Sequence, residues 1–166
     1  GQFNLAKRIP GKEEFAETIR YFQRLIETTG VKLRLGTRAG ASDLAGFDEI
    51  VLATGVTPRV PAIEGIDHPK VVGYVDASRG AVPVGERVAI IGAGGIGFDV
   101  AELITHAGPS TSESREAFWA SWGIDQRLEA RGGVEGIAAA PHPSPREVVL
   151  LQRKTSKVGD GLGKTT

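Results

Sequence analysis

The sequence predicts an α/β protein with a Rossmann-like parallel sheet, and three observations carry this prediction. A compact apolar strand over Arg87–Ile91 runs directly into the glycine-rich loop Gly92–Gly97. An amphipathic helix follows this loop to about His106, so the strand, loop and helix are contiguous. Glu147–Gln152 is a second apolar run of the kind that occupies parallel sheets. We therefore expect the two strands to be parallel neighbours in a doubly wound sheet, with the first strand central.

The first eighty residues contain one clear helix and several shorter apolar runs. Apolar residues at helical spacing predict a helix over Lys12–Thr29, which has acidic residues in its first turn and Gly30 as its stop. Alternating or continuous apolar runs predict strands at Val31–Leu35, Phe47–Thr54 and Val71–Val75. The run at Phe47–Thr54 is the most apolar of the three, and we expect it to be buried.

Residues 107–146 lack the regular apolar spacing of the preceding segments, because they are rich in Ser, Pro, Gly and Ala. A short helix is predicted at Phe118–Trp122, where we expect Trp119 and Trp122 to be packing residues. If Glu147–Gln152 is the second strand of the unit, these residues form an insertion between the helix and that strand.

Composition excludes several classes of function. Lys+Arg and Asp+Glu both number 20, so the net charge of zero gives no case for binding nucleic acid or an anionic membrane. The chain has no cysteine, which excludes disulfides, thiolate zinc sites and iron–sulfur ligation within it. The three histidines lack metal-ligand spacing, so no metal site is predicted. No apolar run approaches the roughly 18 residues of a membrane span. We expect a cytoplasmic protein.

The glycine loop has the spacing of a dinucleotide-binding fingerprint in the required context. Gly92 permits the tight turn, Gly94 lets the backbone approach a pyrophosphate, and Gly97 lets helix and strand pack closely. Gly95 completes the set of candidate cofactor-binding glycines. Free amides and the helix dipole favour the phosphates at this position. The alternative is a glycine-rich turn in another kind of α/β protein.

The second strand indicates which nucleotide is bound. The fingerprint expects an acid at the tip of that strand, where it holds the ribose 2′-hydroxyl. Here the strand ends in Gln152, Arg153 and Lys154, which include no acid. Two cations suit a 2′-phosphate, so NADP is preferred over NAD. The alternative is an exposed charged pair that binds nothing.

A second phosphate-binding motif is suggested by Gly163-Lys164-Thr165, which resembles the end of a P-loop. The complete pattern needs glycine where this chain has Val158, and neither a strand directly before nor a helix after frames the loop. A P-loop phosphotransferase is therefore the weakest of the functions considered.

Several segments along the whole chain together resemble bacterial NADPH-dependent 2,4-dienoyl-CoA reductase. This resemblance includes the insertion and is more specific than the glycine motif alone. The segments that carry it are Gly1–Asn4, Ile9–Phe15, Gly65–Val71, Val88–Asp99, Trp122–Asp125 and Leu151–Lys154.

The resemblance implies a flavoprotein of fatty acid β-oxidation. That family has an FMN-bearing barrel with a 4Fe-4S cluster, followed by FAD- and NADPH-binding domains like those of glutathione reductase. Electrons would pass from NADPH to FAD, then to the cluster, FMN and the dienoyl-CoA. The barrel, the cluster cysteines and the first FAD-binding βαβ unit have no counterpart in this chain.

An internal fragment of such a reductase is therefore expected, whose partner is the rest of the parent polypeptide. Residues 1–80 would be the middle of the FAD-binding domain. Residues 81–166 would be the first part of the NADPH-binding domain, with an insertion at about 107–146. The isolated chain is expected to be inactive and to hold FAD poorly. The alternative is a non-catalytic Rossmann-like nucleotide-binding module.

The resemblance also assigns individual residues, although none matches the family's acid–base group, so no catalytic residue is predicted. FAD contacts are implied for Gln2, Lys12, Ala39, Thr54 and Gly55. NADPH contacts are implied for Gly92, Gly94, Gly97, Arg153 and Lys154.

Overall fold

The computed structural model describes residues 1–160 and 162 of the chain. Its α-helices are α1 (Phe3–Ala6), α2 (Phe15–Thr29), α3 (Tyr74–Arg79), α4 (Gly95–Thr105) and α5 (Arg115–Trp122). Two short 3-10 turns lie at Ala41–Leu44 and Arg131–Gly133. The strands are β1 (Arg87–Ile91) and β2 (Glu147–Leu151).

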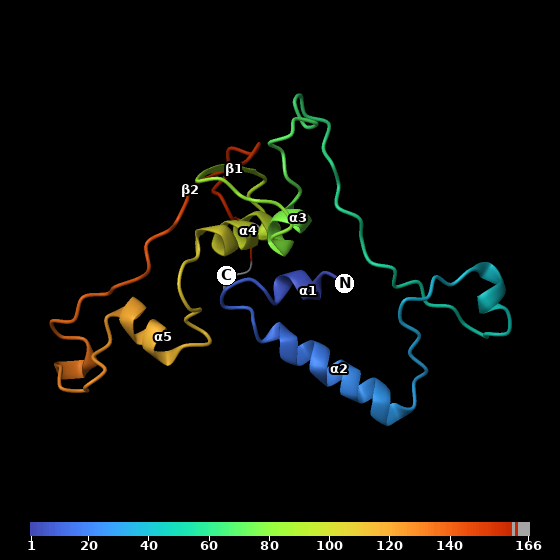
Figure 1. The fold of residues 1–166 in the computed structure, drawn as a ribbon, viewed down its shortest axis with the longest axis horizontal. Coiled ribbons are helices and arrows are strands. Elements are labelled where there is room, and N and C mark those ends of the chain that lie inside the picture. The colour runs from blue at the N-terminus through green and yellow to red at the C-terminus, as the bar shows by residue number, and fades with distance from the viewer. Residues whose placement is uncertain (161, 163–166) are drawn as a thin grey trace.

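A βαβ unit forms the centre of the molecule (Figure 1). β1 and β2 are parallel and in full register, with Arg87 opposite Glu147 and Ile91 opposite Leu151. Both strands pack on α4. The predicted α/β class and the parallel pairing of these two strands are therefore confirmed. Within the part of the chain that the structure describes, β1 pairs with β2 alone, so its expected central position stays a prediction.

Among the described residues, helix packing covers a single face of this sheet. Alternate residues of each strand, such as Val88 and Ile90, are half-buried, whereas their neighbours are exposed. Ile91 is 63% exposed and Leu151 47%. The apolar runs were expected to be buried on both sides, as in a doubly wound sheet. Helix α4 covers one side, and no described helix packs on the other.

The N-terminal helices form a chain of contacts that leads to α4 (Figure 1). α1 packs on α2 and α3, and α3 packs on α4. Ile9, Val100 and Ile104 are buried, so the core lies between α4 and the loop after α1. Gly30, in the left-handed region with φ +73°, ends α2 as predicted.

Three predicted strands are absent from the structure. Val31–Leu35 and Phe47–Thr54 are irregular, and Val51 is 88% exposed although burial was expected. Val71–Val75 is likewise not a strand, because its last two residues begin α3, between Gly73 and Gly80. An apolar run becomes a strand only where a neighbouring strand pairs with its backbone groups, and residues 1–160 and 162 provide no such neighbour for these segments.

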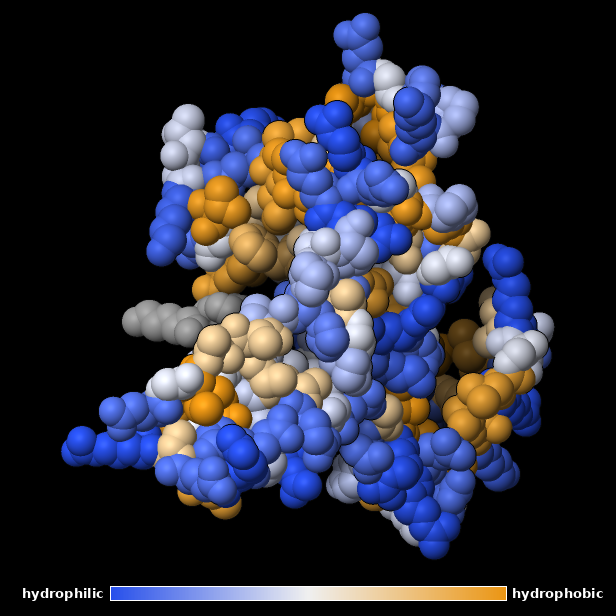
Figure 2. Space-filling model, turned by 60° about the vertical axis from the view of Figure 1, so that its left-hand side comes forward, coloured by the Kyte–Doolittle hydropathy of each residue, from blue (hydrophilic) through white to orange (hydrophobic). Residues whose placement is uncertain are grey.

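The large solvent-accessible surface of the chain is consistent with a lack of strand partners for these apolar runs. The chain exposes 13599 Å², whereas a folded monomer of this size exposes about 7,900 Å². Many apolar side chains therefore lie at the surface among hydrophilic ones (Figure 2). In Figure 1 the segment between α2 and α3 extends away from the helices.

Residues 107–146 fold around α5 on another side of the βαβ unit (Figure 1). Their expected assignment as an insertion stays a prediction. Ser114 accepts a hydrogen bond from the Ala117 amide and caps α5, whose helix was predicted from Phe118. The buried Asp125 carboxylate accepts hydrogen bonds from the amides of Arg127, Glu129 and Ala130. These bonds organise the loop that follows α5.

The two tryptophans of α5 differ from expectation. Trp119 is half-buried, and the Arg115 guanidinium lies 4.9 Å from its ring centroid. Trp122 is 68% exposed, so its predicted packing role is wrong for the described chain. The Trp122 ring lies 6.1 Å from the Phe118 ring, centroid to centroid, and Phe118 is itself 41% exposed, so this pair lies at the surface.

Within residues 1–160 and 162, each helix is too short or too polar to pass through a lipid bilayer. The expected cytoplasmic location stays a prediction. Of the motif Gly163-Lys164-Thr165, which resembles a P-loop, nothing can be added, because it lies outside the described residues.

A candidate dinucleotide-binding site

The glycine loop begins at the carboxyl end of β1. The Gly92 amide donates a 2.8 Å hydrogen bond to the Leu151 carbonyl oxygen, which continues the ladder one residue past β1. Gly92 then takes φ +119°, a conformation that residues with a Cβ rarely adopt. The sharp turn predicted for this position is present, and it directs the chain into α4.

Gly97 shows the closest approach of backbone in the βαβ unit. A Cβ atom at this position would lie 1.9 Å from the Gly92 carbonyl oxygen and 3.8 Å from the Ile90 side chain. Glycine alone fits without a shift of the backbone, because every other residue would place its Cβ in a steric clash with that carbonyl oxygen. The first turn of α4 is consequently seated directly on β1, as the fingerprint requires.

Gly94 and Gly95 shape the first turn of α4. Gly94 is the N-cap residue, with φ −97° and ψ −175°, and its carbonyl oxygen accepts a hydrogen bond from the Phe98 amide. A Cβ at Gly94 would meet nothing within 4 Å, so the fold itself does not demand glycine there. One at Gly95 would lie 3.6 Å from the Leu162 side chain. The leading amides of α4 have no partners within the helix and suit a phosphate.

The two predicted cations lie at the same edge of the sheet as the glycine loop. Because Ile91 pairs with Leu151, Gly92 and Gln152 both follow directly from the carboxyl ends of their strands. Arg153 and Lys154 are exposed, and neither forms an ion pair with a carboxylate of residues 1–160 or 162. Ligands of open parallel sheets bind at this carboxyl edge.

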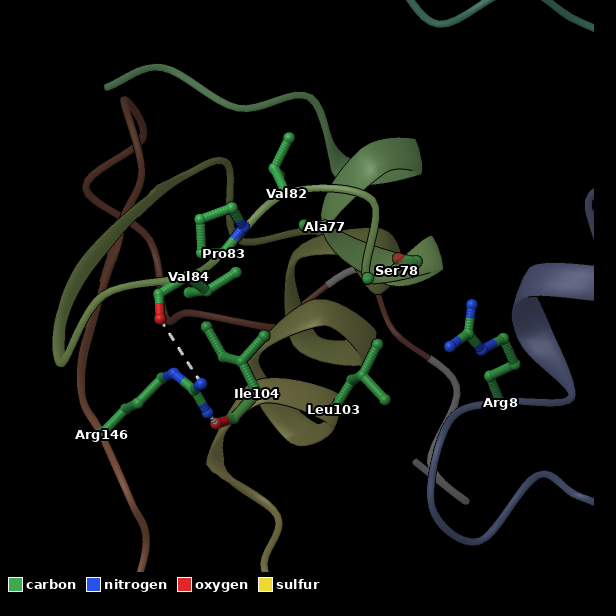
Figure 3. A pocket seen from close by; sticks show the side chains of 10 residues that line it. Arg8, Ala77, Ser78, Val82, Pro83, Val84, Leu103, Ile104 and Arg146 are labelled. Atoms are coloured by element: carbon green, nitrogen blue, oxygen red, sulfur yellow. Dashed lines mark hydrogen bonds between the residues drawn. The ribbon is translucent and has the colours of Figure 1, made fainter. Parts of the chain in front are cut away.

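Arg146 has a role that the sequence did not reveal. Its guanidinium donates to the carbonyl oxygens of Ile104 at 2.8 Å, Gly85 at 3.1 Å and Val84 at 3.4 Å. Figure 3 shows Arg146 at the side of a cavity of about 330 Å³, beside Val84 and Ile104. It ties the last turn of α4 to the segment before β1 at the point where the insertion rejoins the sheet. No local pattern marks such a long-range contact.

The residues implied for FAD are only partly brought together. The Gln2 amide donates to the Tyr74 hydroxyl at 3.0 Å and borders a depression of about 510 Å³. Val56, next to Gly55, borders the same depression. Two arginines, Arg8 and Arg79, also line it, and no acidic residue does.

The other implied FAD residues do not line the depression that Gln2 borders. The Lys12 ammonium forms a half-buried ion pair of 2.5 Å with Asp99 of α4. Ala39 and Thr54 are exposed in irregular segments and do not line this depression. The expected strand before Thr54 and Gly55 is missing, which explains why these two residues are not held at a strand end.

The residues present fit a dinucleotide phosphate. Gly97 seats the helix, Gly95 and Ile96 at the start of α4 are exposed, and cations follow the neighbouring strand. Among residues 1–160 and 162, no three His, Asp or Glu side chains gather closely enough to hold a metal ion. The arrangement defines a nucleotide-binding α/β protein of the Rossmann type.

Comparison with known proteins gives the family. The family model of the pyridine nucleotide-disulphide oxidoreductases matches residues 6–153, and the chain belongs to that family. The family binds FAD and a nicotinamide dinucleotide, and the Rossmann-like fold predicted from the sequence is thereby confirmed.

Individual relatives are reductases with diverse names. The chain is 33% identical over 115 residues to the bilirubin reductase of Mediterraneibacter gnavus, covering 68% of this chain and 18% of that protein. It is 32% identical over 99 residues to the cinnamate reductase of Clostridium sporogenes, covering 58% and 15%. A solved 2-naphthoyl-CoA reductase with 2-naphthoyl-CoA superimposes with a TM-score of 0.58 at 37% identity, covering 63% of this chain and 16% of that one. The chain thus spans less than a fifth of the length of these relatives.

Proposed function

We propose that this chain is the electron-input segment of a flavin-dependent reductase, the part that takes electrons from NADPH and delivers them to FAD. The observation that carries this proposal is the seat of α4 on β1, where a Cβ at Gly97 would lie 1.9 Å from the Gly92 carbonyl oxygen. A helix held this closely presents its amides to a pyrophosphate at the carboxyl edge of the sheet.

Each residue of the site has a role in binding or orientation. The leading amides of α4 bind the pyrophosphate, and the open space at Gly94 lets the phosphates reach them. Arg153 and Lys154 bind the 2′-phosphate and make NADPH the preferred nucleotide. The ion pair of Lys12 with Asp99 holds the N-terminal segment on α4. When bound, NADPH supplies a hydride that FAD accepts.

FAD is proposed to lie on the side of Gln2. The depression bordered by Gln2, Arg8 and Arg79 is lined by cations without an acid, which suits a pyrophosphate. We propose the division into residues 1–80 for FAD and 81–166 for NADPH, with the insertion at 107–146. The 4Fe-4S cluster would belong to another part of the parent polypeptide, since this chain has no cysteine to ligate it. FMN would belong to the barrel that the sequence resemblance implies.

The substrate proposed for the parent enzyme is a 2,4-dienoyl-CoA, which would place it in fatty acid β-oxidation. The sequence resemblance supports this choice, and so does the solved relative named as a 2-naphthoyl-CoA reductase, which holds a CoA thioester. Other relatives are named for cinnamate and bilirubin, so the substrate is best decided by assay.

A non-catalytic nucleotide-binding module is the second candidate. It is favoured by the position of Ala39 and Thr54, which lie exposed and do not line the depression that Gln2 borders. Flavin content separates the two candidates. We expect the intact gene product to purify with FAD and its flavin to be reduced faster by NADPH than by NADH under anaerobic conditions. A colourless protein that binds NADPH would favour the module.

An activity assay of the 166-residue chain alone tests whether substrate reduction depends on other parts of the parent polypeptide. We expect no reduction of a dienoyl-CoA, because the hydride donor beside the substrate would belong to the FMN barrel. Weak flavin binding is also expected. A yellow protein with turnover would contradict the electron-input proposal and identify a small complete enzyme.

A further inference from the structure

Gln152 is the first residue after β2 and makes an unusual pair of hydrogen bonds. Its side-chain amide nitrogen donates to the Lys154 carbonyl oxygen at 2.9 Å and to the Ser156 carbonyl oxygen at 2.5 Å. An amide group has two N–H donors, so both are used. The side chain is half-buried, whereas the residues that follow it are exposed.

These two bonds organise the turn that carries the cations. Both acceptors are backbone carbonyls within four residues of Gln152, so the chain folds back around one side chain. Arg153 and Lys154 lie inside this loop of hydrogen bonds and have no ion pair within the part of the chain that the structure describes. Without such bonds an exposed turn would adopt many conformations, and the two cations would then occupy many positions.

The chemical nature of Gln152 matters for a second reason. It occupies the tip of the second strand, where the dinucleotide fingerprint places an acid that accepts the ribose 2′-hydroxyl. A carboxylate at this position would repel a 2′-phosphate, and it could not donate to the two carbonyls. The neutral amide avoids the repulsion and supplies both donors.

We propose that Gln152 is a positioning residue for 2′-phosphate recognition, which holds the turn so that Arg153 and Lys154 reach one phosphate together. This inference rests on the proposed binding of NADPH. It assigns to Gln152 no contact with the nucleotide and no part in hydride transfer.

The test uses ADP-ribose and its 2′-phosphate as probes, with binding to the intact gene product measured by calorimetry. Gln152→Met keeps the length of the side chain and removes both donors. We expect its affinity for 2′-phospho-ADP-ribose to fall about tenfold, the effect of losing two neutral hydrogen bonds. Affinity for ADP-ribose should stay within about twofold, because the glycine loop is intact. Gln23→Met, at an exposed position of α2, is the matched control and should change neither affinity.

Two additional variants separate positioning from contact. Gln152→Glu should lose more affinity for the 2′-phosphate than Gln152→Met, since it adds repulsion. Replacing Arg153 and Lys154 by glutamine should cost less in the Gln152→Met background than in the wild type, because residues that act together are not additive.

Failure of the inference and failure of the proposed function give different results. If the wild-type protein binds the two probes equally, the NADPH proposal is wrong. If the wild type prefers the 2′-phosphate and Gln152→Met keeps that preference, Gln152 does not position the cations. An equal loss of affinity for both probes in Gln152→Met would also overturn the inference, since it would indicate that Gln152 has a general structural role.

Discussion

Replacing Gly97 by alanine places one methyl group at the closest contact of the βαβ unit. The new Cβ would start 1.9 Å from the Gly92 carbonyl oxygen, whereas real Cβ atoms essentially never come within 3.0 Å. Helix α4 and the loop must therefore separate by about 1 Å, and such overpacking costs about 1–3 kcal/mol of stability. The Gly92 amide, which donates to the Leu151 carbonyl, belongs to the residue that must move.

Nucleotide binding should suffer more than stability. The displaced amides belong to the proposed phosphate site, and a misplacement of about 1 Å can cost on the order of a hundredfold. We expect Gly97→Ala to lower the melting temperature and to weaken NADP binding about a hundredfold, measured by thermal unfolding and calorimetry. Gly73→Ala is the control, since a Cβ there meets nothing within 4 Å and φ is −69°. Wild-type stability and affinity in Gly97→Ala would refute the reasoning.

Three more variants test other parts of the account. Replacing Arg153 and Lys154 by glutamine should weaken NADPH binding about tenfold to a hundredfold per lost contact and leave NADH nearly unchanged, measured by titration; equal losses would show that neither reads the 2′-phosphate. Arg146→Leu should lower the free energy of unfolding in urea by about 2 kcal/mol, because three carbonyls lose a charged donor. An unchanged urea midpoint would show that Arg146 does not stabilise the contact between α4 and the segment before β1. Backbone amides of Ala130 and Arg127 hold the pKa of the Asp125 carboxyl below its ordinary 3.8. The ionised carboxylate therefore stabilises the fold above pH 3.8, and this contribution is lost as the pH falls through the lowered pKa. Asp125→Asn should reduce the fall in melting temperature at acid pH, and an unchanged fall would contradict the stabilising role of the carboxylate.

Local patterns predicted the first strand, the glycine loop and the helix of the βαβ unit well because these three elements are contiguous in sequence. There is no gap in the sequence between the strand Arg87–Ile91, the turn at Gly92 and the helix that begins at Gly95. The close contact at Gly97 requires glycine, and that glycine can be recognised in the sequence. Helix α2 was likewise found from spacing and its Gly30 stop, with an error of three residues at its start.

Features that depend on distant partners were not predictable in this way. Phe47–Thr54 has the composition of a strand, but a strand also needs a neighbour, and the sequence does not say which segment supplies one. Val71–Val75 was misassigned because its apolar residues outweighed the signals at Gly73 and Gly80 that bound α3. The bonds that Arg146 makes to Val84, Gly85 and Ile104 join residues far apart in the sequence, so no local pattern predicts them.

The central claim is that a dinucleotide binds at the glycine loop, and Gly94→Ala tests it most directly. A Cβ at Gly94 meets nothing within 4 Å of protein, and φ −97° suits alanine, so the fold should be unchanged. The same methyl group would occupy the space through which the pyrophosphate approaches α4. We predict that calorimetric titration with NADP shows binding to the wild type and at least about a tenfold loss in Gly94→Ala, with identical melting temperatures. Equal affinities in the two proteins would place the nucleotide elsewhere and contradict the account.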